Sequence, residues 1–567
     1  MKLIYKLLMV IGVFSFTFSC TSFELDLLEN PNAIAPENAS LNDLYNNIQL
    51  TFRNVYSSAQ GTTGAAARMY HAGGGTYEDF AIPEAFDGLW INAYSNLFPD
   101  VDALEAIASE QGFDLHSGTA KIMKAYTMLT LVDVLGDVPF SEALQGTDVI
   151  SPSTDSGSSV YDAALSLLDE AIGQLEGNEA AGPTYEGFYS GSTDNWIKAA
   201  NSMKLKAALN KGDAGTINSL VSGGNIIDEA SEDFQFNYGS QRTNPGSRHP
   251  FYNSHYEQGD GAYISNYYMW LLVGDKVDAE GNTINDPRRR YYFTRKVEKA
   301  DEQDQTTYSC HFSIFPDQEA KPAHWDATSP NVPYCILPGT GYSGRDHLNP
   351  DGIPPDGPIR TSYGLYPGGG EFDYDQFEDT RNLGTTGGMG EGIWPILISP
   401  MVDLMRAEAA LTLGTNDDAR EMLENGVRAS IEKAVSFESL VPGTMSKEIE
   451  IRDEIFTVEE LYGVTEEDID NYVSQVLALY DAANDDGKLD LVAKEMMIAS
   501  WGNGLEAYNL YRRTGKPNNV QPALEASYGQ FPRSFLYPAI SVTRNASISQ
   551  KDLSTDVFWM DSSIDLY

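Results

Sequence analysis

Apolar residues spaced three and four positions apart dominate both ends of this 567-residue chain. The clearest stripe comprises Val160, Ala164, Leu167, Leu168, Ala171, Ile172 and Leu175. Such spacing puts one apolar face along an α-helix, and that face must be buried against another element. Short turns rich in glycine or aspartate separate these segments, as at Gly414. The pattern predicts a mainly α fold in which helical hairpins bury their stripes by stacking.

The middle of the chain departs from this pattern. From about residue 237 to 394 it is rich in Gly, Pro, Tyr and Asn, with few helical stripes. Long irregular segments in compact proteins are usually functional. We therefore predict an N-terminal helical scaffold (41–236), a loop-rich, irregular second lobe with aromatic ligand contacts (237–394), and a C-terminal helical scaffold with a closing segment (395–567).

The first 19 residues have the layout of a secretory signal peptide, in which two lysines precede the apolar run Leu7–Phe18 and the small Ser19. This run is too short for a permanent bilayer-spanning helix, and no later stretch is long and apolar enough. We predict cleavage before Cys20, lipid on that cysteine and an acidic tether over 20–40, so that only the lipid contacts the membrane. An ordinary secreted protein is the alternative, because the two residues before Ser19 fit a lipidation signal poorly.

The chain carries a formal net charge of −45. Such a charge repels phosphates and disfavours both nucleic acids and anionic lipid surfaces as partners. The acidic residues are spread along the chain, which mostly indicates a solvated surface. Of the three cysteines, Cys310 and Cys335 either pair or remain two free thiols. This number indicates neither a disulfide framework nor a cysteine-based metal site.

Catalytic motifs are lacking in the sequence. It contains no phosphate-binding loop, no His-Glu-x-x-His and no Gly-x-Ser-x-Gly. We therefore expect no enzymatic activity and no cofactor. One weak metal candidate remains, a Gly/Pro-rich loop whose oxygen ligands could hold calcium: Asp346, Asn349, Asp351 and Asp356. Turn-forming Asn and Asp residues are the alternative interpretation of this loop.

Aromatic residues are dense in the predicted lobe and in the glycine-rich stretch near residues 70–90. Aromatic faces with polar tips suit sugar rings and peptide backbones alike, but they also build ordinary cores. Most of these side chains are expected in the lobe core, with a few facing a ligand. The ligand contacts we predict are Tyr77, Trp90, Trp270 and Tyr342.

Several ordered motifs resemble one family. The most specific is the helix end Leu131–Leu135 followed by Gly136-Asp137-Val138-Pro139. Asn30-Pro31-Asn32 precedes it, and Arg406–Ala409 and Tyr511–Gly515 follow it in the expected order. Together they resemble the SusD/RagB outer-membrane lipoproteins of Bacteroidetes over nearly the whole mature chain.

The resemblance implies a tetratricopeptide-like helical scaffold that supports a variable loop lobe. It also implies lipid on Cys20 and a place on the outer face of the outer membrane. The implied role is capture of an oligosaccharide or oligopeptide nutrient and its delivery to a TonB-dependent, SusC-like transporter, over which the protein closes as a lid. A surface glycan hydrolase and an adhesin or structural lipoprotein are the alternatives.

Overall fold

The computed structural model describes residues 40–567 except 177–181, 260, 303–320, 351–356 and 358. The predicted signal peptide, Cys20 and the tether up to residue 39 lie outside the described residues, as do Cys310, Asp351 and Asp356. Among the helices that are described, none is both long and apolar enough to cross a bilayer.

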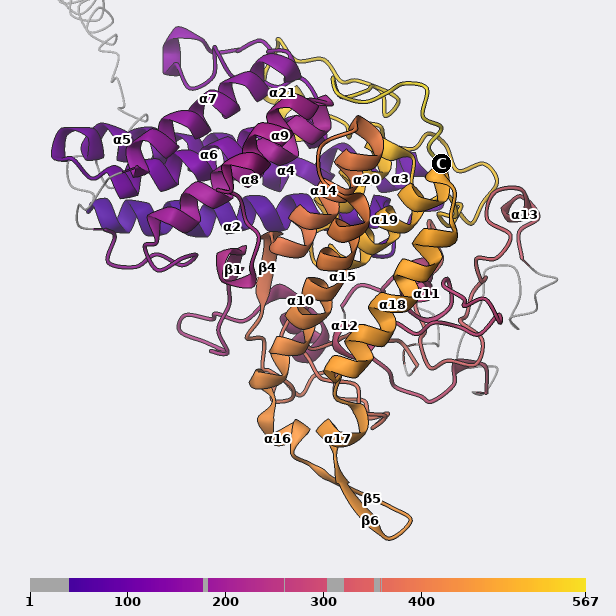
Figure 1. Ribbon diagram of the computed structural model, residues 1–567. Helices are drawn as coiled ribbons and strands as arrows, with labels where there is room; N and C mark the ends of the chain where they lie inside the picture. The colour runs from indigo at the N-terminus through magenta and orange to yellow at the C-terminus, as the bar shows by residue number, and fades with distance from the viewer. Residues whose placement is uncertain (1–39, 177–181, 260, 303–320, 351–356, 358) are drawn as a thin grey trace, which may run out of the picture.

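Helices form the N-terminal end of the described chain, and most of them pack on the next helix in sequence (Figure 1). They are α2 (Leu41–Ala66), α3 (Tyr77–Phe80), α4 (Asp87–Trp90), the π-helix η3 (Ile91–Leu97), α5 (Phe98–Gln111), α6 (Asp114–Leu135), α7 (Gly157–Leu175), α8 (Thr193–Lys211) and α9 (Ala214–Gly223). The predicted stripe lies on α7, whose buried face contacts α6 and α8. Ser156 and Ser192 begin α7 and α8 by accepting a backbone N–H.

The C-terminal end is also helical. Its helices are α14 (Ser399–Leu413), α15 (Ala419–Val435), α16 (Pro442–Met445), α17 (Val458–Tyr462), α18 (Glu466–Ala482), α19 (Asp485–Ala499), α20 (Gly504–Thr514) and α21 (Ala539–Arg544). A hairpin of β5 (Glu448–Ile451) and β6 (Glu454–Thr457) projects away from them (Figure 1). The mainly α fold predicted from the stripes is confirmed.

The two helical ends form one body, because α2, at the start of the described chain, packs against α20, which lies near the end of the chain. A buried charge cluster joins them. Lys206 of α8 places its Nζ 3.2 Å from Asp133 Oδ2 of α6 and 2.8 Å from Glu506 Oε1 of α20. Buried charges need such partners, since water no longer solvates them.

The segment between the helical ends is largely irregular. Its short elements are α10 (Pro250–Tyr252), the π-helix η6 (Asn253–Gln258), α11 (Asn266–Val273), α12 (Arg289–Tyr292), β2 (Phe293–Thr294), α13 (Trp325–Thr328) and β3 (Ser362–Tyr363). Strand β1 (Phe234–Asn237) pairs antiparallel with β4 (Ile393–Leu397), so the segment leaves and re-enters the scaffold at one ribbon. The predicted lobe boundaries, 236/237 and 394/395, both fall within this ribbon.

Aromatic residues build the core between the irregular lobe and the scaffold. Trp501, which follows α19, has no exposed surface and stacks on Tyr268 of α11, with 4.8 Å between ring centroids. Phe251 stacks on Tyr363 at 4.2 Å. The Tyr268 hydroxyl also donates to carbonyls at the end of α19. Most lobe aromatics are therefore core residues, as the sequence favoured.

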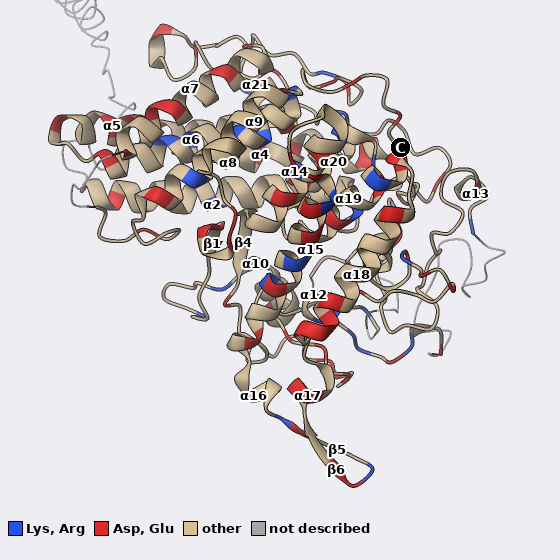
Figure 2. Cartoon of the chain, viewed as in Figure 1, with Lys and Arg blue, Asp and Glu red and all other residues tan. Residues whose placement is uncertain are grey.

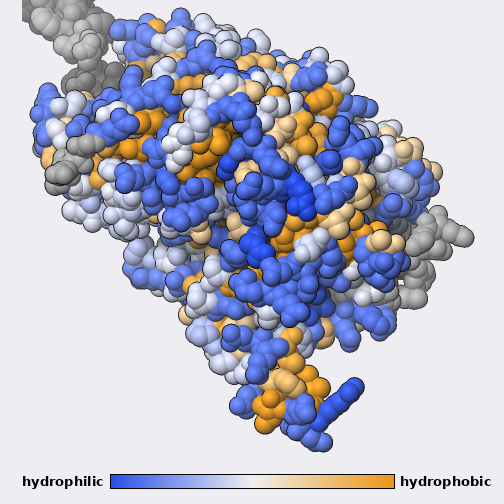
Figure 3. All heavy atoms as spheres, viewed as in Figure 1, coloured by the Kyte–Doolittle hydropathy of each residue, from blue (hydrophilic) through white to orange (hydrophobic). Residues whose placement is uncertain are grey.

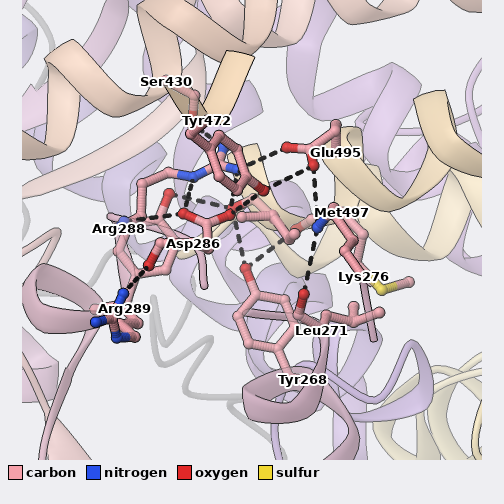
Figure 4. Close-up of polar contacts among 12 residues, drawn as sticks. Tyr268, Leu271, Lys276, Asp286, Arg288, Arg289, Ser430, Tyr472, Glu495 and Met497 are labelled. Atoms are coloured by element: carbon pink, nitrogen blue, oxygen red, sulfur yellow. Dashed lines mark hydrogen bonds and ion pairs between the residues drawn. The ribbon is translucent and has the colours of Figure 1, made fainter. Parts of the chain in front are cut away.

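A second buried charge cluster fastens the lobe to the C-terminal helices (Figure 4). The Arg288 guanidinium lies 2.6 Å from both Asp286 Oδ2 and Glu495 Oε2, which belong to the lobe and to α19 respectively. The Tyr472 hydroxyl of α18 lies 2.7 Å from the same Asp286 oxygen. Lys276 Nζ lies 3.0 Å from Glu495 Oε1. Burial alone would raise the pKa of Asp286, but the adjacent Arg288 holds that pKa below its usual value.

The surface agrees with the acidic composition. Figure 2 shows Asp and Glu residues distributed over the helices of both ends. Figure 3 shows a largely hydrophilic face with apolar residues on the β5–β6 hairpin, where Ile455 is 65% exposed. Interspersed charge of this kind favours solubility and specifies no particular ligand.

We expect Arg288→Met to lower the free energy of unfolding by about 3–5 kcal/mol, because it removes the guanidinium that lies between two buried carboxylates and leaves Lys276 as the nearest cation of the cluster. Arg420→Met is the matched control, since the Arg420–Asp481 pair is exposed and such pairs contribute little. Guanidinium denaturation of both variants checks this. Equal effects of the two substitutions would show that the Arg288 cluster does not hold the lobe.

Candidate ligand-binding site

A cavity of about 590 Å³ opens in the irregular lobe at the carboxyl end of α11. Its lining combines two aromatic rings, several prolines and a few polar side chains, a composition typical of ligand sites. The residues that line it are Trp270, Val273, Gly274, Thr283, Lys321, Asp326, Pro330, Asn331, Val332, Pro333, Tyr334, Ile336, Leu337, Pro338 and Thr340.

Trp270 owes its position to the way α11 ends. The backbone N–H groups of Gly274 and Asp275 both donate to the Trp270 carbonyl, at 2.9 and 3.0 Å. A Cβ at position 274 would lie 2.6 Å from Cδ1 of the Trp270 ring. The absence of a side chain at Gly274 therefore lets the indole lie across the end of the helix, where it borders the cavity.

The opposite wall is anchored to a distant segment of the chain. Trp325 of α13 donates from Nε1 to the Ala523 carbonyl at 3.0 Å. Ser329 donates from Oγ to the Val520 carbonyl at 2.7 Å. The Tyr334 ring meets the Trp325 ring edge to face, with 5.9 Å between centroids. These contacts place Tyr334 beside the cavity.

Asp346 holds the loop that carries Tyr334. Its carboxylate accepts the Cys335 backbone N–H at 2.8 Å and the side-chain amides of Asn266 and Gln521 at 3.0 and 2.9 Å. Burial raises the pKa of Asp346, and these three donors oppose that rise. The buried carboxylate thus replaces regular secondary structure as the support for residues 330–338.

Charged groups occupy one side of the cavity. Lys321 donates from Nζ to the Pro330 carbonyl at 2.6 Å and lies 3.8 Å from Asp326 Oδ1. Burial lowers the pKa of Lys321. Together with the backbone and Asn331, these groups could form directional hydrogen bonds to a neutral polar ligand stacked on the rings.

Two family profiles match the chain. The profile described as "Starch-binding associating with outer membrane" matches residues 31–334, and that described as "Susd and RagB outer membrane lipoprotein" matches residues 394–554. This chain belongs to the SusD-like family. The resemblance predicted from its ordered motifs is confirmed. No curated protein matches the chain.

Solved structures share the fold of this SusD-like chain. A SusD/RagB family protein from Bacteroides thetaiotaomicron has a TM-score of 0.60 and 18% identity, with 90% of this chain and 95% of that chain covered. A SusD homologue from Bacteroides uniformis has a TM-score of 0.61 and 18% identity, with 92% and 99% covered. A protein described as chitin-binding also has a TM-score of 0.61 and 18% identity, with 92% and 100% covered.

The SusD-like motif around Gly136 supports the scaffold. Gly136 ends α6 with a φ of +78°, a backbone conformation that suits glycine. The Asp137 carboxylate accepts the Gly157 N–H at the start of α7 at 2.7 Å. The Tyr537 hydroxyl donates to the Asp137 carbonyl at 2.8 Å. The motif thus ties α6 to α7 and to the closing segment.

The four predicted ligand contacts do not lie together. Trp270 borders the cavity described above, whereas Trp90 borders a separate hollow formed by other elements. Tyr77 has no exposed surface, and its hydroxyl lies 2.9 Å from His347 Nε2. Tyr342 is buried beneath the Arg295 guanidinium, 5.3 Å from the ring centroid. In this conformation neither buried tyrosine offers a face to a ligand.

In the described part of the predicted calcium loop, the candidate oxygen ligands lie inside the protein and contact other protein groups. Both carboxylate oxygens of Asp346 already accept hydrogen bonds, and Asn349 is buried. Asp351 and Asp356 lie outside the described residues. Over the residues that are described, no three His, Cys, Asp or Glu side chains are grouped to hold a metal ion. Cys335 is disulfide-bonded, and the two other cysteines fall outside the described ranges.

Tyr334 and Lys321 border the cavity but were not among the predicted contacts. The run Pro330-Asn331-Val332-Pro333-Tyr334 was the available signal, because prolines stiffen a loop and so favour presentation of an aromatic ring. Their approach to Trp270 depends on contacts with residues 520–523, which local sequence does not reveal.

We expect Asp346→Ala to loosen residues 330–338, because three buried donors lose their acceptor, each at a cost of about 1–3 kcal/mol. Hydrogen exchange of this segment should accelerate. Asp326→Ala is the control, since it removes an exposed carboxylate from the same cavity. Unchanged exchange in Asp346→Ala would mean that other contacts hold the loop.

Proposed function

We propose that this SusD-like chain is a non-enzymatic cell-surface protein that binds an oligosaccharide or oligopeptide nutrient in the Trp270 cavity. The observation that carries the proposal is the pairing of two aromatic residues, Trp270 and Tyr334, with polar groups at one concave site in the irregular lobe. Sugar rings and peptide backbones both bind by stacking on aromatic faces and by hydrogen bonds at their edges.

The cavity chemistry favours binding over hydrolysis. Glycoside hydrolysis generally needs two carboxyl groups on opposite sides of the scissile bond. Among the described residues that line the cavity, Asp326 supplies the one carboxylate. The chitin-binding structural relative supports an oligosaccharide as the first ligand to test, while an oligopeptide remains the second.

We further propose that lipid on Cys20 anchors the chain to the outer membrane, facing outward, and that the chain closes as a lid over a TonB-dependent, SusC-like transporter. Membership of an outer-membrane lipoprotein family supports the anchor. Co-purification with a large barrel from detergent-solubilised outer membranes would support the transporter complex. An adhesin or structural lipoprotein would form no such complex.

We expect Trp270→Ala and Tyr334→Ala each to weaken binding of the captured oligosaccharide or oligopeptide by about tenfold or more, because each removes a stacking surface. Calorimetric titration against a panel of both ligand classes measures this. Tyr185→Ala is the control, since Tyr185 is 60% exposed and lies outside the cavity lining. Unchanged affinity in both cavity variants, or release of reducing ends from glycans, would contradict the proposal.

We expect Cys20→Ala to release the chain from outer membranes into the soluble fraction, because no other membrane attachment is predicted. Fractionation of cells that express either form measures this. The wild-type chain should additionally incorporate labelled fatty acid. Retention of Cys20→Ala in the membrane fraction would contradict an anchor at this residue.

A further inference from the structure

A second hollow, of about 240 Å³, lies between the π-helix η3, helix α21 and residues 139–152. It shares no lining residue with the Trp270 cavity. Its volume is below the range of about 300–1,000 Å³ that holds larger ligands. The hollow therefore suits a single side chain or a one-ring molecule.

The walls of this hollow are apolar. The Trp90 ring lies against the Tyr94 ring, with 4.4 Å between centroids, and is half-buried. Ile91 and Leu144 also line it and are 37% and 46% exposed. Exposed large apolar side chains grouped around a concavity indicate a binding surface. A flat ring or branched alkyl group would cover them.

Two polar groups on α21 at the same hollow have no partner in the part of the chain that the structure describes. The Ser541 hydroxyl is buried and has no hydrogen-bond partner among the described residues. Arg544, three positions later on the same helix face, is exposed, and its guanidinium makes no ion pair or hydrogen bond with any described residue. A buried hydroxyl without a partner is costly, so its presence points to an acceptor that binds there.

Two further polar side chains of the hollow, Tyr94 and Asn545, already have hydrogen-bond partners. The Tyr94 hydroxyl donates to the Pro139 carbonyl at 2.7 Å. The Asn545 amide donates to the Pro152 carbonyl at 2.8 Å. Among the described lining residues, Arg544 is the one cation, and Ser541 carries the buried hydroxyl without a partner. A guanidinium binds a carboxylate through two parallel hydrogen bonds, and a nearby hydroxyl can donate a third.

The backbone at this hollow is also unusual. Ile91–Leu97 forms a π-helix, which brings Ile91, Tyr94 and Ser95 to the lining. π-Helical turns are rare and often occur at functional sites. This is a third observation that marks the hollow as a site.

We propose that this hollow binds an aryl or alkyl group that carries a carboxylate. The apolar group lies beside Trp90 and Leu144, and the carboxylate accepts hydrogen bonds from Arg544 and Ser541. The site is separate from the nutrient cavity and does not depend on the function proposed for it. A free small acid and the carboxyl-terminal residue of a polypeptide share this chemistry.

The test uses fluorine NMR of the full chain labelled with 5-fluorotryptophan. The chain has seven tryptophans, and Trp90→Phe identifies the resonance of Trp90. The probe is 3-phenylpropionate, and the neutral comparison is 3-phenylpropan-1-ol. We expect a saturable shift of the Trp90 resonance with a Kd of about 1 mM or below, while the Trp270 resonance does not move.

The alcohol and the Arg544→Gln variant should each weaken this binding by about tenfold, because a charge-assisted hydrogen bond is lost. Ser541→Ala should weaken it by a smaller factor. Arg452→Gln is the matched control, since Arg452 is exposed in the turn between β5 and β6. Unchanged positions of the other tryptophan resonances report that each variant is folded.

A second titration distinguishes the two sources of the carboxylate. It compares N-acetyl-Gly-Gly-Phe with a free terminal carboxylate against the same peptide as an amide. Binding of the peptide acid supports a polypeptide terminus, and binding of phenylpropionate alone supports a free small acid. No saturable Trp90 shift with either acid would overturn the proposal. Equal binding of acid and alcohol, or unchanged binding in Arg544→Gln, would also overturn it.

Discussion

The buried guanidinium of Arg288 is the contact on which the arrangement of lobe and scaffold depends. It joins Asp286 of the lobe to Glu495 of α19, and Tyr472 of α18 completes the cluster. A charge without water is tolerated only when its partners are close and well oriented. Hydrophobic contacts would permit many ways of laying irregular loops on helices, whereas this cluster specifies one.

The same principle recurs within the lobe on a smaller scale. An irregular segment leaves backbone groups that no helix or sheet satisfies, so side chains must bond them. Asp346 accepts the Cys335 N–H, and Asn266 donates to the Cys335 carbonyl at 3.0 Å. These side-chain hydrogen bonds therefore determine how rigid the cavity wall is. A loop built this way can change its exposed residues while its buried anchors hold the shape.

The sequence alone predicted which segments are helical and which are irregular better than it predicted the roles of single residues. The stripe along α7 predicted a helix because its period admits no other regular structure. Tyrosines in the lobe had no such period. Tyr77, Tyr342 and Trp270 all lie in glycine-rich or aromatic stretches of the sequence, yet of these three only Trp270 borders the 590 Å³ cavity. The Asp346 carboxylate has the oxygen ligands that calcium prefers, but in the structure its oxygens accept hydrogen bonds from three protein donors.

The sequence by itself determined the helical scaffold, the irregular middle segment and membership of the SusD-like family, because periodicity and ordered motifs are local properties of the chain. Only the tertiary structure decided which aromatic residues border a cavity and which are core. Trp325 and Ser329 reach Ala523 and Val520, nearly two hundred positions away in the chain. Ser541 and Arg544, which have no hydrogen-bond partner among the described residues, line the same hollow as Trp90 from the other end of the sequence. Contacts of this range depend on how the helices pack, and no local pattern encodes them.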